Sequence, residues 1–200
     1  MAISKTHGPE IIMGAYEAGQ RVFGENKVQE MVWKHEHHPK DIEWHLVGHL
    51  QRNKVRHIAP FVSLIHSVDS LRLLQEISKE AIKNQRVIKC LLQVHIADEE
   101  TKFGLDDAEL KEIIDYYLKE EVKGVELCGL MGMATLTDDM RKISEEFQYL
   151  RGLFSTIKSE HLPHLPGFKE LSMGMSSDYT IAIENGSTMV RIGSNIFGYR

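Results

Sequence analysis

The apolar stretch VIKCLLQVHI (residues 87–96) is followed by a second one, VELCGLM (residues 125–131), and these two runs decide the fold. Both are short and rich in valine, isoleucine and leucine, which is typical of buried strands. The amphipathic stretch between them begins at Asp106 or Asp107, either of which can start a helix. Two buried strands joined by a helix predict a parallel pair with a crossover connection.

The same alternation continues in both directions along the chain. Strand-like runs are predicted at residues 2–4, 22–24, 43–48, 64–68, 87–96, 125–131, 170–175 and 189–192. Helix-like stretches separate most of them, so eight parallel strands are expected, and that number favours a closed (β/α)8 barrel over an open sheet. No linker or low-complexity segment divides residues 1–200, which predicts a single domain.

Composition excludes several classes of protein. With 24 Lys and Arg against 29 Asp and Glu, the net charge of −5 offers no general attraction to nucleic acid or anionic lipid. No apolar run approaches the roughly 20 residues of a membrane helix, and the start lacks the apolar core of a secretory leader. Cys90 and Cys128 form no C-x-x-C pair, which argues against a disulfide scaffold or a cysteine zinc site. We expect a cytoplasmic protein, monomeric or weakly dimeric.

A lysine directly follows the first strand-like run. Lys5 comes after residues 2–4 and precedes the turn-forming pair Gly8-Pro9. At the carboxyl end of a barrel strand, its amine is expected to point into the mouth, where desolvation favours the neutral form that makes a Schiff base. The alternative is a solvated lysine at the start of a loop, because lysines are mostly exposed.

Small and hydroxyl-bearing residues follow the last two strand-like runs. Ser176 comes after residues 170–175, and Gly193 and Ser194 come after residues 189–192. Loops after strands seven and eight form the usual phosphate site of such a barrel, because glycine allows close approach of the backbone and N–H groups at a helix start bind anions. The same residue types also form caps and turns without any ligand.

Arg191 lies within the last strand-like run, between Val190 and Ile192. Side chains alternate along a strand, so Arg191 is expected to point away from its neighbours and into the barrel. A buried cation is costly unless it is paired or bound to a ligand. Two interpretations follow: contact with a ligand, or an internal ion pair.

Other polar residues carry weaker signals. Asn26 and Asn53 follow the second and third strand-like runs, where they either line the same mouth or form turns and caps. The histidine-rich residues 35–38 do not match the zinc-protease pattern, so a solvated loop is expected there and no metal site. Residues 51–57 are basic, but without interleaved aromatic residues they predict an exposed helix start rather than an RNA-binding patch.

Several of these segments, taken together, resemble a known family. The matching segments are AISKT (2–6), QRVFGEN (20–26), WHLVGHLQRNK (44–54), SMGMS (172–176) and VRIGSNIFG (190–198). They occur in the order found in the pyridoxal phosphate homeostasis proteins (the YggS/PROSC family), which are similar to the barrel domain of alanine racemase. Members of that family normally carry a helical segment before the lysine strand, so this chain is expected to lack that helix.

The resemblance implies a site for pyridoxal 5′-phosphate (PLP). Lys5 matches the lysine that forms the Schiff base, and Arg191 matches the arginine that faces the pyridine nitrogen. Gly193 and Ser194 match backbone phosphate binders, and Ser176 matches a hydroxyl that contacts the phosphate. Asn26 and Asn53 match further residues of the cofactor-binding site. Met175 and the polar pair Glu99 and Lys102 are implied to lie beside that site.

The resemblance also implies a role in vitamin B6 homeostasis without robust turnover. An arginine only donates hydrogen bonds, so Arg191 is expected to keep the pyridine nitrogen unprotonated and to weaken PLP as an electron sink. A racemase needs a second base, and the only tyrosine near the site in sequence is Tyr199, which nothing places on the opposite face. We expect a carrier that passes PLP to apo-enzymes; a PLP-dependent amino-acid racemase and a phosphate-binding barrel without PLP are the alternatives.

Overall fold

The computed structural model describes residues 1–99, 103–119 and 122–198, and its strands form one parallel sheet in the order β1 to β8. The strands are β1 Ala2–Ile3, β2 Val22–Glu25, β3 Glu43–Leu46, β4 Leu64–Val68, β5 Ile88–Gln93, β6 Val125–Met131, β7 Glu170–Met175 and β8 Met189–Arg191. The backbone N–H of Ile3 donates to the carbonyl of Ile192 at 2.7 Å, and Ile192 donates to Met1 at 3.1 Å. These bonds join the first strand to the last and close the barrel predicted from the sequence.

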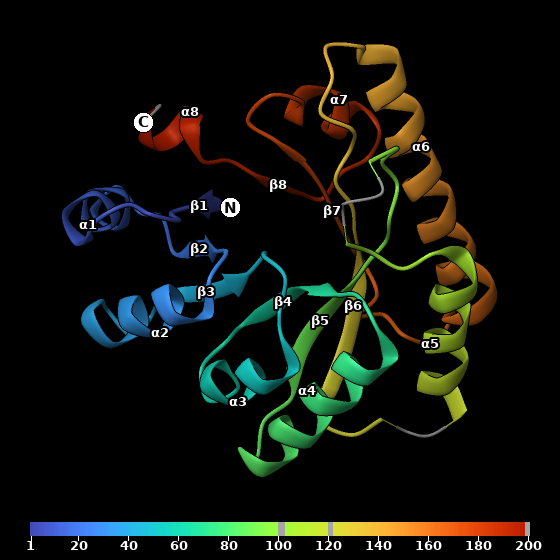
Figure 1. Cartoon of the computed structure of the whole chain (residues 1–200), viewed down its shortest axis with the longest axis horizontal. Helices are drawn as coiled ribbons and strands as arrows, with labels where there is room; N and C mark the ends of the chain where they lie inside the picture. The colour runs from blue at the N-terminus through green and yellow to red at the C-terminus, as the bar shows by residue number, and fades with distance from the viewer. Residues whose placement is uncertain (100–102, 120–121, 199–200) are drawn as a thin grey trace.

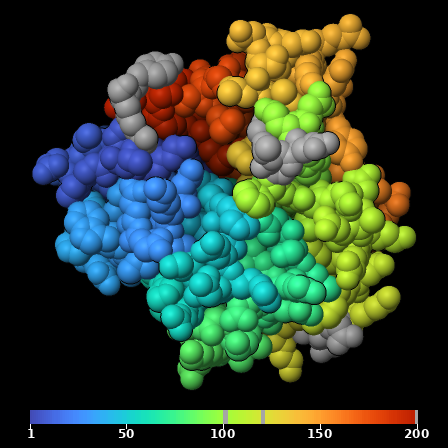
Figure 2. All heavy atoms as spheres, in the orientation of Figure 1, coloured from blue at the N-terminus to red at the C-terminus, as the bar shows by residue number. Residues whose placement is uncertain are grey.

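A helix follows each strand and packs on the outside of the sheet (Figure 1). The helices are α1 Pro9–Glu17, α2 Val28–His37, α3 Val55–Ile58, α4 Leu71–Lys83, α5 Asp107–Lys119, α6 Met140–Thr156, α7 Tyr179–Glu184 and α8 Ser194–Phe197; a 3₁₀ turn, η1 Arg52–Lys54, precedes α3, and a π-helical turn, η2 Ile157–His161, extends α6. Figure 2 shows the blue N-terminal and red C-terminal parts of the chain meeting on the surface. Within the described residues, no helix has the length and apolar character needed to cross a membrane.

The buried apolar residues form two clusters. The large cluster fills the layer between the sheet and the helices, and it includes Phe23 and Trp44. The small cluster, which includes Leu64 of β4 and Leu91 of β5, has Met189 of β8 packed against it. Because β4 and β8 are not neighbours in the sheet, these side chains meet inside the barrel, which is therefore filled rather than open.

Two local predictions were wrong. The loop expected at residues 35–38 is the end of α2, and His38 is buried, with its Nδ1 2.7 Å from the carbonyl oxygen of Lys34. Met31 and Lys34 both point inward from α2, so a charged residue interrupts its apolar stripe. The strand predicted at residues 87–96 ends at Gln93.

Candidate functional site

Lys5 lies in a tight turn at the carboxyl end of β1. Ser4 extends the strand by donating its N–H to Gly24 at 3.1 Å, and the N–H of His7 donates back to the carbonyl of Ser4 at 3.1 Å. Thr6, directly after Lys5, has φ of 64°, a left-handed conformation that is uncommon for threonine. Lys5 is exposed while Ser4 is fully buried, so the lysine is accessible to solvent at the carboxyl end of β1.

A buried network of ion pairs and hydrogen bonds connects this turn to α2. The Lys34 ammonium donates to the Ser4 carbonyl at 2.7 Å, to Glu25 Oε1 at 2.8 Å and to Glu30 Oε1 at 2.7 Å. Ser4 Oγ also donates to Glu25 Oε1 at 2.5 Å, and the N–H of Thr6 donates to Glu30. The residues on either side of Lys5 are therefore both tied to α2.

The loops after β7 and β8 contact each other beside this turn. The N–H of Gly193 donates to Ser176 Oγ at 3.2 Å, and the Asn195 amide donates to the carbonyl of Ser176 at 3.3 Å. A Cβ on Gly193 would come within 3.4 Å of the Ile3 carbonyl oxygen, so this loop lies against β1. The structure thus brings Ser176 and Gly193 together next to the strand that leads to Lys5, and Ser194 begins α8 at the same place.

Arg191 points into the barrel and is 5% exposed. Its Nη1 donates to both the carbonyl and the hydroxyl oxygen of Ser172 at 2.8 Å, and its Nη2 donates to the carbonyl of Gly132 at 2.9 Å. These acceptors are neutral, and no carboxylate of the described part of the chain lies within ion-pair distance. Burial lowers the pKa of Arg191 to about 10, so the guanidinium stays charged at neutral pH. Met175 is its partner in the β7–β8 register.

Two histidines continue from Ser172 across the interior of the barrel. His66 Nδ1 lies 3.0 Å from Ser172 Oγ, and His66 Nε2 lies 3.1 Å from His45 Nδ1. His66 is fully buried and His45 is 5% exposed. Sequence reasoning placed both residues on strands but gave neither a role. The signal available in the sequence was a histidine within each of two predicted strands, 43–48 and 64–68.

Because of these two histidines, we expect the free energy of unfolding to fall as the pH drops below 7. Burial lowers the pKa of His45 to about 4 and lowers that of His66 well below its usual value. The unfolded chain, with histidines near their ordinary 6.5, binds more protons in this range, so their contribution is complete above pH 6.5 and is lost on acidification. Each extra proton changes the free energy of unfolding by about 1.4 kcal/mol per pH unit.

Urea unfolding measured between neutral pH and about pH 4 checks this expectation. His45→Asn removes one of the two groups and is expected to flatten the fall in stability. The matched control is His57→Asn, because His57 is exposed on α3 and its replacement should leave the slope unchanged. Identical slopes in the wild type and in His45→Asn would contradict a neutral, buried His45.

The remaining predicted residues are placed less centrally. Asn26 is half-buried directly after β2, and its carbonyl oxygen would lie 2.3 Å from a Cβ on Gly48. Asn53 is exposed on η1. Glu99 joins two loops, because its Oε1 accepts the N–H of Leu136 at 3.0 Å. The structure therefore groups the predicted residues of β1, β7 and β8, whereas Asn53 and Glu99 belong to other loops. Lys102 and Tyr199 lie outside the described residues.

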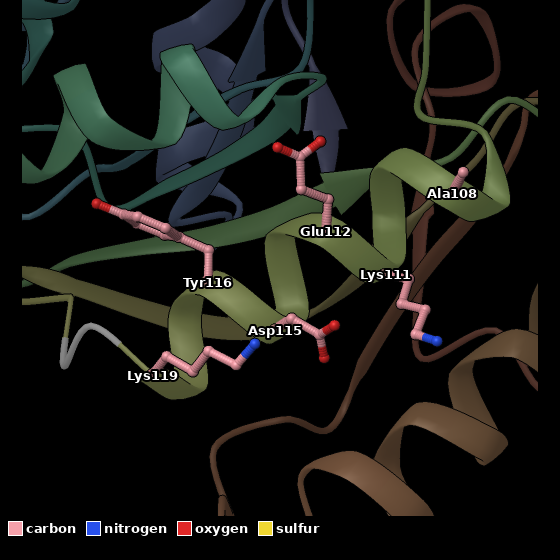
Figure 3. Close-up of a pocket in the computed structure, with 6 residues that line it drawn as sticks. All are labelled: Ala108, Lys111, Glu112, Asp115, Tyr116 and Lys119. Carbon is pink, nitrogen blue, oxygen red and sulfur yellow. The ribbon is translucent and has the colours of Figure 1, made fainter.

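A shallow hollow of about 510 Å³ lies elsewhere, along the outer face of α5 (Figure 3). All six residues that line it come from that one helix, and four of them are charged: Lys111, Glu112, Asp115 and Lys119. This is the solvated face of an amphipathic helix rather than a binding site. Among the described residues, no group of three or more His, Cys, Asp or Glu side chains is arranged to hold a metal.

Comparison with known proteins identifies relatives that match the chain along its whole length. The sequence model of the family "Alanine racemase, N-terminal domain" matches residues 1–200. The pyridoxal phosphate homeostasis protein of Aquifex aeolicus is 42% identical over 100% of this chain and 86% of the relative. That of Vibrio alginolyticus is 40% identical over 100% of this chain and 85% of the relative.

Solved structures extend the comparison. PipY of Synechococcus elongatus, determined with PLP bound, superposes with a TM-score of 0.90 at 36% identity, covering 99% of this chain and 91% of PipY. Alanine racemase of Bartonella henselae shares the fold, with a TM-score of 0.72 at 19% identity over 98% of this chain and 55% of the racemase. By the family match and by these relatives of high coverage, the chain belongs to the alanine racemase N-terminal domain family and, within it, to the pyridoxal phosphate homeostasis proteins.

Proposed function

We propose that this protein binds PLP reversibly through the amine of Lys5 and acts in intracellular PLP homeostasis. The observation that carries the proposal is the grouping of Lys5, Ser176, Gly193 and Arg191 around three adjacent strands, β8, β1 and β7. The relatives named as PLP homeostasis proteins and the PLP-bound PipY structure support the same choice of ligand.

The chemistry of these side chains fits the three functional groups of PLP. A lysine amine condenses with an aldehyde, and the exposure of Lys5 supports its access to a ligand. Ser176 and the backbone around Gly193 and Ser194 provide hydroxyl and N–H donors for a phosphate. The hydrogen bonds of Arg191 use its terminal nitrogens, and within the described residues no acceptor faces its Nε–H. That donor would face the pyridine nitrogen.

The residues of the chain determine what the bound group does. PLP supplies an electrophilic aldehyde and, when its ring nitrogen is protonated, an electron sink. Arg191 remains a cation and donor at neutral pH, so it holds the ring nitrogen in its unprotonated, accepting form. This favours storage and protection of the aldehyde over carbanion chemistry.

We propose that the protein turns over no amino acid and releases PLP to apo-enzymes that depend on it. The competing hypothesis is an amino-acid racemase, which would exchange the α-proton of a substrate with solvent. Incubating the PLP-loaded protein with a panel of L-amino acids in D₂O tests both ideas. We expect no catalytic loss of the α-proton signal in NMR spectra, and multiple turnovers with any one amino acid would favour the racemase.

The cellular setting is part of the proposal. Cys90 and Cys128 are unpaired and buried, which fits a reducing compartment such as the cytoplasm. The monomeric or weakly dimeric state stays a prediction, to be measured by analytical ultracentrifugation.

Titration of the purified protein with PLP is the direct test of the function. We expect a visible absorption band that saturates at one PLP per chain and a covalent mass increase on Lys5 after borohydride reduction. Pyridoxal without phosphate is expected to bind more weakly, because it lacks the group that Ser176 and Gly193 would hold. A protein that binds inorganic phosphate but stays colourless with PLP would support the phosphate-binding barrel instead.

A further inference from the structure

Four polar side chains form a continuous chain of hydrogen bonds through the barrel. It runs from His45 on β3 through His66 on β4 and Ser172 on β7 to Arg191 on β8. Each of the four is at most 5% exposed. Strands β4 and β7 are not neighbours in the sheet, so the contact between His66 and Ser172 crosses the interior. We refer to these four residues as the lumen relay.

Arg191 sets the direction of the hydrogen bonds in the lumen relay. A guanidinium only donates, so Ser172 Oγ accepts from Nη1 at 2.8 Å. The positive charge favours a hydroxyl whose hydrogen points away from it, toward His66 Nδ1 at 3.0 Å. His66 then carries its proton on Nε2 and donates to His45 Nδ1 at 3.1 Å. In this arrangement the negative end of each dipole faces Arg191, and both imidazoles are neutral.

Neutral imidazoles suit the surroundings of the lumen relay. Burial is the main cause that lowers the pKa of both rings, and the positive charges of Arg191 on His66 and of Lys89 on His45 act in the same direction. A second or third buried cation at this place would be costly, because the described residues include no carboxylate hydrogen-bonded to either ring. The histidines therefore serve here as oriented dipoles.

We propose that His66 is a positioning residue for Arg191. By holding the Ser172 hydroxyl with its oxygen toward the guanidinium, His66 fixes the orientation in which Arg191 meets the pyridine ring of PLP. The effect on PLP rests on the proposed function, whereas the effect on Arg191 rests on the contacts of the lumen relay alone. His66 acts through Ser172, and His45 accepts the hydrogen bond from His66 Nε2.

The ligand-free protein tests the positioning directly by nitrogen-15 NMR. We expect the imidazole signals of His45 and His66 to show neutral rings protonated on Nε2. The Arg191 guanidinium should rotate slowly in the wild type and faster in His66→Leu, where the Ser172 hydroxyl loses its acceptor. A His66 ring protonated on Nδ1, or unchanged Arg191 signals in His66→Leu, would overturn the proposal.

Titration with PLP tests the consequence for the cofactor. We expect His66→Leu to raise the Kd about tenfold, the size of one charge-assisted hydrogen bond, and to alter the pH dependence of the visible band. In His66→Asn the side-chain oxygen can replace Nδ1 as the acceptor, so its Kd should stay within about threefold of the wild type. Leu91→Ala, a buried change inside the barrel but outside the lumen relay, controls for a loss of packing.

The outcomes separate the two proposals. Equal PLP binding and spectra in the wild type and His66→Leu would refute the positioning role. A His66→Asn protein that binds PLP as weakly as His66→Leu would also refute the positioning role. PLP binding would then depend on the imidazole ring itself and not on its hydrogen-bond acceptor. A wild type that shows the expected NMR signals but binds no PLP would refute the proposed function and leave the positioning of Arg191 intact. If His66→Leu does not fold, the histidine tautomers of the wild type and the PLP affinity of His66→Asn still test the positioning role of His66.

Discussion

Lys5→Ala is expected to abolish the visible band of the PLP-treated protein and any borohydride-stable attachment of the cofactor. The reason is chemical, because only an uncharged primary amine forms a reversible covalent bond with the aldehyde, and the substitution leaves the phosphate and ring contacts in place. We expect the apparent Kd for PLP to rise at least a hundredfold, equivalent to about 2.7 kcal/mol. Absorbance titration and intact-mass analysis after reduction provide the measurement.

Two further variants show whether the amine or merely the charge of Lys5 matters. Lys5→Arg keeps a cation at the mouth but cannot form the covalent bond, so it should match Lys5→Ala in lacking the band while retaining somewhat better phosphate affinity. Lys158→Ala removes an exposed lysine from η2, far along the chain from the site, and should bind PLP as the wild type does. A visible band that survives in Lys5→Ala would place the attachment on another lysine.

The sequence predicted the barrel because buried parallel strands leave a simple signature. The runs at residues 64–68 and 125–131 match β4 and β6 residue for residue, since their apolar composition reflects burial on both faces. The end of helix α2 was not predicted, because one of its buried positions holds a charged residue instead of an apolar one. Its buried position 34 holds a lysine, whose three hydrogen-bond acceptors include two from other parts of the chain, Ser4 and Glu25. A lysine that is buried by contacts with distant parts of the chain cannot be distinguished, in the sequence alone, from a solvated lysine.

One part of the candidate site could be predicted from the sequence and another part could not. The positions of Lys5 and Ser176 could be predicted, because residues that directly follow barrel strands gather at one end of the barrel. The lumen relay could not, because His66 meets Ser172 across 106 positions of sequence and only closure of the barrel brings them together. Arg191 was expected to face the interior, but its neutral backbone and hydroxyl acceptors correspond to neither an ion pair nor a sequence motif.

The buried ammonium of Lys34 gives the largest expected effect on stability. Its side chain is 2% exposed, and its three N–H bonds are all used, on Ser4, Glu25 and Glu30. Burial raises the pKa of Glu25, although Lys34 and Ser4 act against that rise. Burial also acts to raise the pKa of Glu30, but hydrogen bonds from Lys34 and Thr6 outweigh it and hold that pKa below its usual value.

Lys34→Met should therefore lower the free energy of unfolding by about 3–5 kcal/mol, the cost of leaving a buried charge without its partner. Methionine is close in length to the lysine stem, so the loss reports the ammonium rather than a cavity. The double variant Glu25→Gln/Lys34→Met removes both charges and is expected to recover most of the stability. Urea unfolding of the wild type, both single variants and the double variant gives the coupling energy between the two residues.

The same network links stability to the site, because Ser4 and Thr6 flank Lys5 and are both held by it. We expect Lys34→Met to weaken PLP binding as well, since the turn that presents Lys5 loses its support from α2. Lys111→Met, an exposed lysine-to-methionine change on α5, is the matched control and should alter neither quantity. If Lys34→Met cost less than about 1 kcal/mol, the ion network would be exchanging freely with water, and Lys5 would have to be held by the loops after β7 and β8 instead.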